Sequence, residues 1–347
     1  MLILFFILTC ILALINKKKL IHVLFLSFAY LFSIMRHEEI PDTVNYIELY
    51  NDPLALNHIG NFETGYIFLC YLFNDILGVK FELFIFIWSL SFFEIWYAIS
   101  RKLLPKDNLI MAFSLFMSFY GFFYFGIAFR NMIALMIVYS AIFIYLHYKK
   151  VIKYFICLLL CLLAYEFHRT TILFLLLIPF INKKYHKSVY IIMYSLSVLL
   201  LILSNMDIFN GVFGIMGNIE EFERLEHYMK EVDNNTSVFS VQILLNFLVS
   251  IYSYLQRDNI MEENKKIYNF FFNLNVVGIL FMCISLKMPV AYRFYNTFFF
   301  FNFILLYLMF YRNKLPLFIK HGYLYSIIAS VVYFVSLIYC NSFMLLY

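Results

Sequence analysis

Apolar runs alternate with short charged loops along nearly the whole chain. A helix needs roughly 20 predominantly apolar residues to cross a bilayer, and several of these runs approach or reach that length. The runs cover residues 2–15, 20–35, 81–100, 109–126, 131–148, 154–167, 170–181, 189–205, 238–255, 267–286, 294–311 and 322–345. The pattern predicts an all-α protein, a polytopic transmembrane helical bundle of about 12 spans.

One further segment, 63–78 ("ETGYIFLCYLFNDILG"), is amphipathic and carries Glu63 and Asp75. It can lie at the interface, re-enter the membrane or cross it. If it does not cross, the lysine-rich loops all fall on one side of the membrane. The positive-inside rule makes that side cytoplasmic. We therefore favour an interfacial or re-entrant helix here.

This layout turns two long loops, about 36–62 and 206–237, outward, and both are rich in Asp and Glu. We see no internal repeat, no low-complexity tract and no soluble domain. The sequence therefore predicts a single integral membrane domain over residues 1–347. The first run starts at Met1 without a basic leader, which favours a retained helix over a cleaved signal.

Composition agrees with a membrane protein. The 347 residues are 64% hydrophobic and only 14% charged, which excludes a soluble domain of this length. The 44 Phe and 29 Tyr are expected on the lipid-facing surface and in interfacial belts, with a minority free to stack on sugar rings. Nearly all six cysteines lie in apolar runs, so we expect neither a disulfide nor a metal site. The basic residues form short loop clusters rather than one patch, and no nucleic acid is expected as a partner.

Four arginines end helices on the predicted outer side: Arg36, Arg130, Arg169 and Arg293. A single arginine at such a place is most often an anchor that extends its side chain to the interface. Four on the face opposite the basic loops are harder to explain as anchors. The planar guanidinium binds phosphate oxygens in pairs, so this cluster predicts a site for a lipid-linked phosphate or diphosphate.

The outer loops carry further polar candidates. Asp42, Tyr46 and Tyr50 are spaced to share one face of a helix. That helix can be a surface helix with interfacial tyrosines, or it can line a sugar site. His168 can be an interfacial histidine bonded to backbone or water, or a general base, since its ordinary pKa lies near neutrality. The adjacent pair Glu38–Glu39 is a weak candidate for a divalent cation.

Several short motifs occur in a fixed order between about residues 36 and 300. They are Arg36 with Asp42, Tyr46 and Tyr50; the Phe62-Glu63-x-Gly65-Tyr66 element; Arg130 at the start of a helix; the Phe167-His168 pair; and Arg293 before an aromatic helix. In this order they resemble the EpsG/Wzy-like family of polysaccharide polymerases. The chain departs from the family pattern at Thr64, where a proline is usual, and in "HEEIPD", which lacks the glycine-rich lead common before the Asp.

The resemblance implies a multi-pass glycosyltransferase of the cytoplasmic (inner) membrane, with a GT-C-like helical architecture. Such enzymes join oligosaccharide repeat units carried on undecaprenyl diphosphate at the periplasmic or extracytoplasmic face, for O-antigen, capsule or exopolysaccharide. Partners would be the lipid-linked oligosaccharide, membrane lipids and, as a further candidate, a chain-length regulator. No metal or other cofactor is required.

The same resemblance suggests residue roles. Arg130, Arg169 and Arg293, with Arg36 next, would bind the lipid diphosphate. His168 or Asp42 would accept the proton of the acceptor hydroxyl. Glu63, Tyr46 and Tyr50 would hold sugars.

Four alternatives stay open at this point. A flippase for lipid-linked oligosaccharides would also place charges in the membrane, although internal repeats and mid-membrane charges are usual there. A GT-C enzyme using a polyprenyl-monophosphate sugar would depend on a metal at Glu38–Glu39. An O-antigen ligase would share the donor, and a purely structural membrane protein would use none of these residues.

Overall fold

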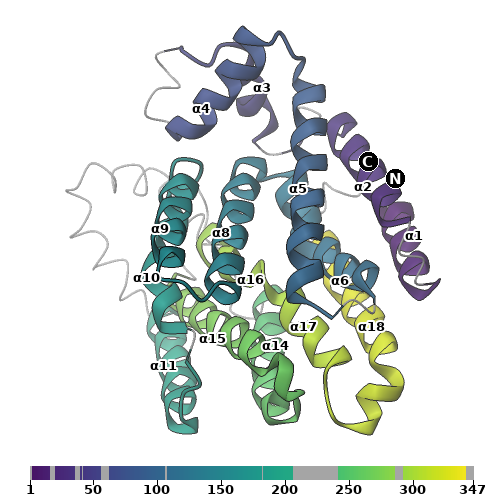
Figure 1. Ribbon diagram of the computed structural model, residues 1–347, viewed down its shortest axis with the longest axis vertical. Coiled ribbons are helices and arrows are strands. Elements are labelled where there is room, and N and C mark those ends of the chain that lie inside the picture. The colour runs from purple at the N-terminus through teal and green to yellow at the C-terminus, as the bar shows by residue number, and fades with distance from the viewer. Residues whose placement is uncertain are drawn as a thin grey trace. The chain divides into compact units, whose positions relative to one another are not determined.

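The computed structural model describes residues 2–15, 20–35, 40, 42–55, 62–105, 108–181, 183–205, 241–285 and 292–340 (Figure 1). The regular secondary structure in these ranges is entirely helical, as the sequence predicts. The chain folds as two compact units, Met1–Phe180 with Phe310–Tyr347, and Ile181–Met309. That both form one membrane domain stays a prediction.

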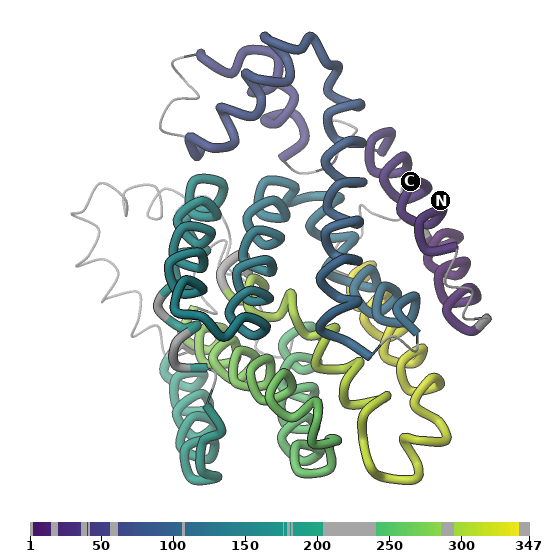
Figure 2. The backbone as a smooth tube through the Cα atoms, in the orientation of Figure 1, coloured from purple at the N-terminus to yellow at the C-terminus, as the bar shows by residue number. Residues whose placement is uncertain are grey.

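The first unit holds most of the helices (Figure 2). They are α1 (Leu2–Ile15), α2 (Ile21–Ile34), α3 (Thr43–Asn51), α4 (Thr64–Tyr71), the π-helix η2 (Leu72–Ile76), α5 (Phe81–Leu103), α6 (Leu109–Phe116), the π-helix η3 (Met117–Gly121), α7 (Phe122–Gly126), α8 (Phe129–His147), α9 (Ile152–Tyr165), the 3₁₀-helix η4 (Arg169–Thr171), α10 (Ile172–Ile181) and α18 (Pro316–Cys340). Neighbouring pairs pack together, above all α8 on α9 and α2 on α5.

The second unit is built around one long helix, α15. Its helices are α11 (Lys187–Asn205), α14 (Val241–Gln256), the 3₁₀-helix η5 (Arg257–Asn259), α15 (Glu262–Ser285), α16 (Tyr292–Phe299) and α17 (Asn302–Tyr311). Helices α11, α14 and α16 all pack on α15. The buried Asn273 amide of α15 donates to the carbonyls of Ile181 and Lys183 and accepts from the Tyr190 hydroxyl, each at 2.7 Å. Buried amides are satisfied in this way when they pack in an apolar core.

Nearly every apolar run becomes a helix with boundaries close to those expected. Five helical stretches are long and apolar enough to cross a membrane: Phe81–Leu103, Leu109–Gly126, Phe129–His147, Glu262–Ser285 and Pro316–Tyr339. Shorter apolar helices include Ile3–Leu14, Ile21–Ile34, Ile152–Tyr165, Lys187–Leu203 and Tyr295–Tyr311. The chain is thus a multi-pass membrane protein by length and composition, and the total of about 12 spans stays a prediction.

The amphipathic segment that begins at Glu63 is a short helix, formed by α4 and η2. At 1.5 Å per residue it is about 20 Å long, which is less than the roughly 30 Å hydrocarbon core. The helix ends at Ile76, and Gly78 follows with a φ of 62°, the left-handed conformation that glycine adopts freely. That the segment does not cross the membrane stays a prediction.

Aromatic rings fill the interior of the first unit. All of the stretch Leu109–Gly126 is buried. The Phe25 ring of α2 lies 5.5 Å from Phe93 of α5 and 4.9 Å from Phe113 of α6, and Trp96 lies 5.3 Å from Phe113. The expectation that the aromatic residues mainly face lipid is therefore wrong for this core, where edge-on and offset ring contacts join three helices.

Candidate functional site

Three ionisable side chains from distant parts of the first unit meet at the start of α4. Glu63 immediately precedes α4, Arg130 lies in the first turn of α8, and His168 follows the end of α9. The Arg130 guanidinium donates to Glu63 Oε2 at 2.5 Å, and His168 Nδ1 lies 3.5 Å from Glu63 Oε1. The two oxygens of one carboxylate thus face two different basic groups. We call these three residues the Glu63 triad.

A main-chain hydrogen bond holds two of the three segments together. The N–H of Gly65 donates to the carbonyl of Glu166 at 2.8 Å. A Cβ atom at Gly65 would lie 2.7 Å from the same oxygen, so only glycine permits this approach. Glu166 contributes its main chain to the site, while its side chain is exposed. The glycine of the Phe-Glu-x-Gly-Tyr element therefore sets the position of Glu63 against His168.

The turn that carries His168 is fixed by its own hydrogen bonds. The His168 N–H donates to the Ala164 carbonyl at 2.9 Å and closes the last turn of α9. The Thr171 hydroxyl donates to the His168 carbonyl at 2.7 Å and starts the next helical turn. The imidazole is buried, with 8% of the residue exposed. Its direction is therefore set by the short link between α9 and α10.

The surroundings favour the charged form of Glu63. The Arg130 guanidinium lies over the Phe62 ring, 5.0 Å from its centroid, which is a cation–π contact. Burial alone would raise the pKa of Glu63. The hydrogen bond from His168 and the electrostatic interactions with Arg130 and His168 outweigh that effect and hold the pKa of Glu63 below its usual range. Glu63 is thus a carboxylate at neutral pH.

The two ends of the α8–α9 hairpin carry different sets of ionisable side chains. The triad lies where α8 begins and α9 ends, whereas Lys149, Lys150 and Lys153 lie at the turn between the two helices. Helix α8 has 19 residues, so the two ends are separated by about 28 Å, close to the thickness of a hydrocarbon core. Lys153 lies over the Tyr145 and Tyr154 rings, at 4.8 and 5.0 Å. The triad and the lysines therefore lie at opposite ends of the hairpin.

The predicted tyrosine face forms, and it packs rather than lying open. In α3 both Tyr46 and Tyr50 are buried, and Tyr46 meets the Tyr66 ring edge-on at 5.7 Å. The Tyr50 hydroxyl donates to the Val79 carbonyl at 2.7 Å. Burial, then the neighbouring Cys70 and Glu82, raise the pKa of Tyr50 to about 12, so its hydroxyl keeps its proton. Asp42 occupies the N-cap position of α3 without a side-chain cap hydrogen bond, in a left-handed conformation, φ 64°, which Asp tolerates.

The other arginines are not placed in the triad. Arg169 is adjacent to His168 in sequence, and its side chain is exposed. Arg293 lies in α16 of the second unit, and its side chain is outside the described residues, as are Arg36 and the pair Glu38–Glu39. In the part of the chain that the structure describes, no group of three or more His, Cys, Asp and Glu residues could hold a metal ion.

Comparison with known proteins adds one decisive finding. The model of the EpsG family matches residues 18–347, nearly the whole chain. The chain belongs to the EpsG family. The family is one of Wzy-like polysaccharide polymerases, so this EpsG-family protein is a glycosyltransferase-type polymerase in its general class. It matches no curated protein and no solved structure.

Within this EpsG-family chain, the motifs named from sequence acquire distinct positions. Phe62, Glu63 and Gly65 shape the turn before α4, while Arg130 and His168 meet that turn. Glu63 was expected to hold a sugar, and the structure gives it two basic partners within the protein. The role of Gly65 against Glu166 was missed, since a glycine in a motif does not reveal which backbone approaches it.

Proposed function

We propose that this EpsG-family protein polymerises oligosaccharide repeat units carried on undecaprenyl diphosphate, at the outer face of the cytoplasmic membrane. The observation that carries the proposal is the Glu63 triad. It places a guanidinium and an imidazole on one carboxylate at one end of the α8–α9 hairpin. The lipid diphosphate would be the leaving group, and the acceptor would be a hydroxyl of the next lipid-linked unit.

Arg130 would stabilise the leaving diphosphate. A guanidinium carries five N–H donors, so it can hold Glu63 and phosphate oxygens at the same time. As the bond between the anomeric carbon and the diphosphate oxygen breaks, the electron pair moves onto the diphosphate. Positive charge placed there beforehand lowers the barrier. Arg169, Arg293 and Arg36 are further candidates for diphosphate contacts.

His168 would act as the general base, and Glu63 would orient it. The acceptor hydroxyl would form the new bond to the anomeric carbon and give its proton to the imidazole. A carboxylate beside the other ring nitrogen fixes the tautomer and stabilises the imidazolium, as in other acid–base pairs. Asp42, at the start of α3, is the second candidate base. Tyr46 and Tyr50 would shape the sugar site next to it.

The outer face is inferred from charge. Lys149 and Lys150 lie at the end of the α8–α9 hairpin opposite to the triad and are exposed. Loops rich in lysine stay in the cytoplasm. The triad would then face the periplasmic or extracytoplasmic side, where the lipid-linked units are expected. O-antigen, capsule and exopolysaccharide are all compatible products.

The experiment is surface glycan length, measured by gel, in cells that lack this protein and are complemented with wild type, Arg130→Ala, His168→Ala or Asn45→Ala. Asn45 is an exposed residue of α3 and serves as the matched control. We expect deletion to reduce a long ladder to single-repeat glycan. Wild type and Asn45→Ala should restore the ladder, and the two site variants should not, at equal membrane levels.

Other outcomes would point elsewhere. Loss of all surface glycan on deletion would favour a flippase or an assembly glycosyltransferase. Retention of full-length polymer on the carrier lipid would favour a ligase. A full ladder with both site variants would show that the triad is structural and would contradict the residue roles given above.

A further inference from the structure

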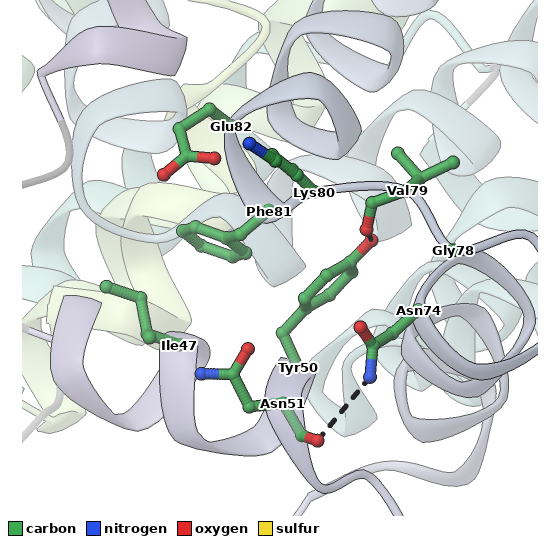
Figure 3. Close-up of a pocket in the computed structure, with 9 residues that line it drawn as sticks. All are labelled: Ile47, Tyr50, Asn51, Asn74, Gly78, Val79, Lys80, Phe81 and Glu82. Atoms are coloured by element: carbon green, nitrogen blue, oxygen red, sulfur yellow. Dashed lines mark hydrogen bonds between the residues drawn. The ribbon is translucent and has the colours of Figure 1, made fainter.

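A second polar pocket lies in the first unit at the other end of the α4–η2 helix (Figure 3). It encloses about 360 Å³ and is formed by α3, by η2 with the loop that follows it, and by the start of α5. Its lining residues are Ile47, Tyr50, Asn51, Asn74, Gly78, Val79, Lys80, Phe81 and Glu82. None of them belongs to the Glu63 triad, and Tyr50 is the one lining residue that also belongs to a family motif named above.

The loop geometry of the pocket is well defined. The Tyr50 hydroxyl donates to the Val79 carbonyl, and the Asn74 amide donates to the Asn51 carbonyl at 3.4 Å and to Asp75 Oδ1 at 2.8 Å. Gly78 makes the tight turn between η2 and α5. These bonds tie three separate elements around one opening, so the pocket does not depend on a single loop.

The chemistry of the lining fits a neutral ligand rich in hydroxyl groups. Figure 3 shows the Asn51 amide, the Lys80 ammonium and the Glu82 carboxylate around the Tyr50 and Phe81 rings. An amide both donates and accepts, an ammonium donates and a carboxylate accepts. Sugar hydroxyls need both kinds of partner.

The charges of the lining argue against an ionic ligand. Lys80 and Glu82 are its two charged residues, and their charges are opposite. A phosphate site would gather arginines or lysines, and a cation site would gather carboxylates. The pocket therefore differs in chemistry from the Arg130 site, which is suited to an anion.

We propose that this pocket is a saccharide subsite that holds a sugar of the glycan away from its reacting end. The inference rests on the proposed function and extends it. From Thr64 to Asn74 the helix advances about 15 Å, so a sugar in this pocket lies beyond the one that reacts at the triad. Binding there would hold the glycan between successive transfers and would lengthen the product.

The test uses the full-length protein in detergent micelles. The probe is polysaccharide from cells that make it with this protein, hydrolysed to short oligosaccharides and labelled with a fluorophore at the reducing end. Binding is followed by fluorescence polarisation for wild type, Asn51→Ala, Glu82→Gln and the control Asn45→Ala. Asn45 lies on the same helix as Asn51, is exposed and does not line the pocket.

We expect Asn51→Ala and Glu82→Gln each to weaken binding about three- to tenfold, the loss of one or two hydrogen bonds, while Asn45→Ala leaves binding unchanged. In cells, Asn51→Ala should still polymerise but make shorter chains. Two site variants are used because Glu82→Gln keeps the shape of the side chain if Asn51→Ala fails to fold.

Unchanged binding by both variants would overturn the proposal, and so would displacement of the probe by inorganic diphosphate, which would make the pocket a phosphate site. Arg130→Ala separates this proposal from the function itself. If Arg130→Ala abolishes polymer while Asn51→Ala changes neither binding nor chain length, the subsite is wrong and the polymerase assignment stands. If Arg130→Ala leaves polymer intact but the pocket variants lose binding, the subsite stands and the role of Arg130 is wrong.

Discussion

At the scale of the residue, one carboxylate determines the geometry of the site. Glu63 Oε2 faces Arg130 and Oε1 faces His168, so displacing Glu63 displaces both partners. The sequence pointed to all three residues individually. It could not show that they meet, because no helical spacing relates positions so far apart along the chain. This is why Glu63 was assigned to sugar binding rather than to its two basic neighbours.

Arg130 should not be replaceable by lysine. Lysine keeps the charge, but its ammonium offers a point donor instead of a planar fork, and it loses the flat contact with Phe62. We expect Arg130→Lys to reach the membrane at normal levels and to lower polymer synthesis by about tenfold to a hundredfold. The measurement is incorporation of radiolabelled sugar into polymer by isolated membranes. Arg101→Lys, at the opposite end of α5 from the pocket, is the control, and equal rates for both variants would refute the bidentate role.

Glu63→Gln should destabilise the protein in a pH-dependent way. A carboxyl whose pKa is lowered by folding adds to the free energy of unfolding above its unfolded pKa, and this addition is lost as the pH falls through the folded pKa. At neutral pH we expect the variant to lose about 1–3 kcal/mol, since it leaves Arg130 poorly paired. The difference in melting temperature between the variant and wild type should shrink as the pH falls below 4.5, the ordinary pKa of this carboxyl group.

The difference is followed by intrinsic fluorescence of detergent-solubilised protein from pH 7 to pH 3. Glu48→Gln, on the exposed side of α3, is the matched control and should show almost no difference at any pH. A difference for Glu63→Gln that stays constant down to pH 3 would mean that the carboxylate charge is not what stabilises the site.

At the scale of the element, the close main-chain contact between the start of α4 and the end of α9 is the part of the site that tolerates substitution least. The bond from Gly65 to Glu166 brings two turns together with almost no space between them. The sequence predicted the helices on both sides with good boundaries, because apolar periodicity and charged loops mark them. It did not predict the contact between Gly65 and Glu166, because a main-chain hydrogen bond leaves no pattern in the side chains.

Gly65→Ala should therefore disrupt the site without unfolding the helices. The added Cβ would lie 2.7 Å from the Glu166 carbonyl oxygen, a main-chain atom that has little room to yield. A displacement of about 1 Å at a catalytic site can lower the rate about a hundredfold. We expect that loss in polymer synthesis at normal membrane levels. Thr64→Ala changes an exposed neighbour and should keep activity, and a fully active Gly65→Ala would contradict the tight contact.

Thr64→Pro should be tolerated and stabilising, although it changes the residue next to Glu63. Thr64 is the first residue of α4, where proline fits, and Glu63 already has the extended backbone that precedes proline, φ −73° and ψ 140°. We expect a gain of about 0.4–1 kcal/mol and unchanged polymer length. Ile67→Pro is the control. It removes the hydrogen bond from the Ile67 N–H to the Glu63 carbonyl and should cost about 3 kcal/mol. A loss of stability with Thr64→Pro would show that the turn needs a different conformation.

At the scale of the whole molecule, composition alone predicts a membrane protein. The pattern of hydropathy predicts where its helices begin and end. The sequence did not reveal the division into two compact units, because both have the same apolar character. It also did not reveal how many aromatic rings lie between helices rather than against lipid. Hydropathy indicates that a side chain avoids water, but it does not show whether that side chain contacts other protein groups or lipid.

The proposed orientation of the chain in the membrane can be tested by labelling single cysteines from outside the cell. If the triad faces outward, Thr64→Cys should react with a membrane-impermeant maleimide in intact cells, and Lys150→Cys should react only after permeabilisation. Both positions are exposed. The native residues Cys10, Cys70, Cys157, Cys161 and Cys283 are buried, so their labelling in the wild type should be low. The reverse pattern would place the triad in the cytoplasm and would refute the outward site.

The separation of the triad along the sequence also sets an order for biogenesis. Glu63 leaves the ribosome about a hundred residues before His168, a delay of roughly 5–20 s at ordinary rates of synthesis. Arg130 follows Glu63 by 67 residues, and the Glu166 carbonyl, on which α4 docks, comes only at the end of the delay. The Glu63 triad can therefore form only after the α8–α9 hairpin has been made, and α4 stays undocked from that hairpin while α5 to α9 are synthesised.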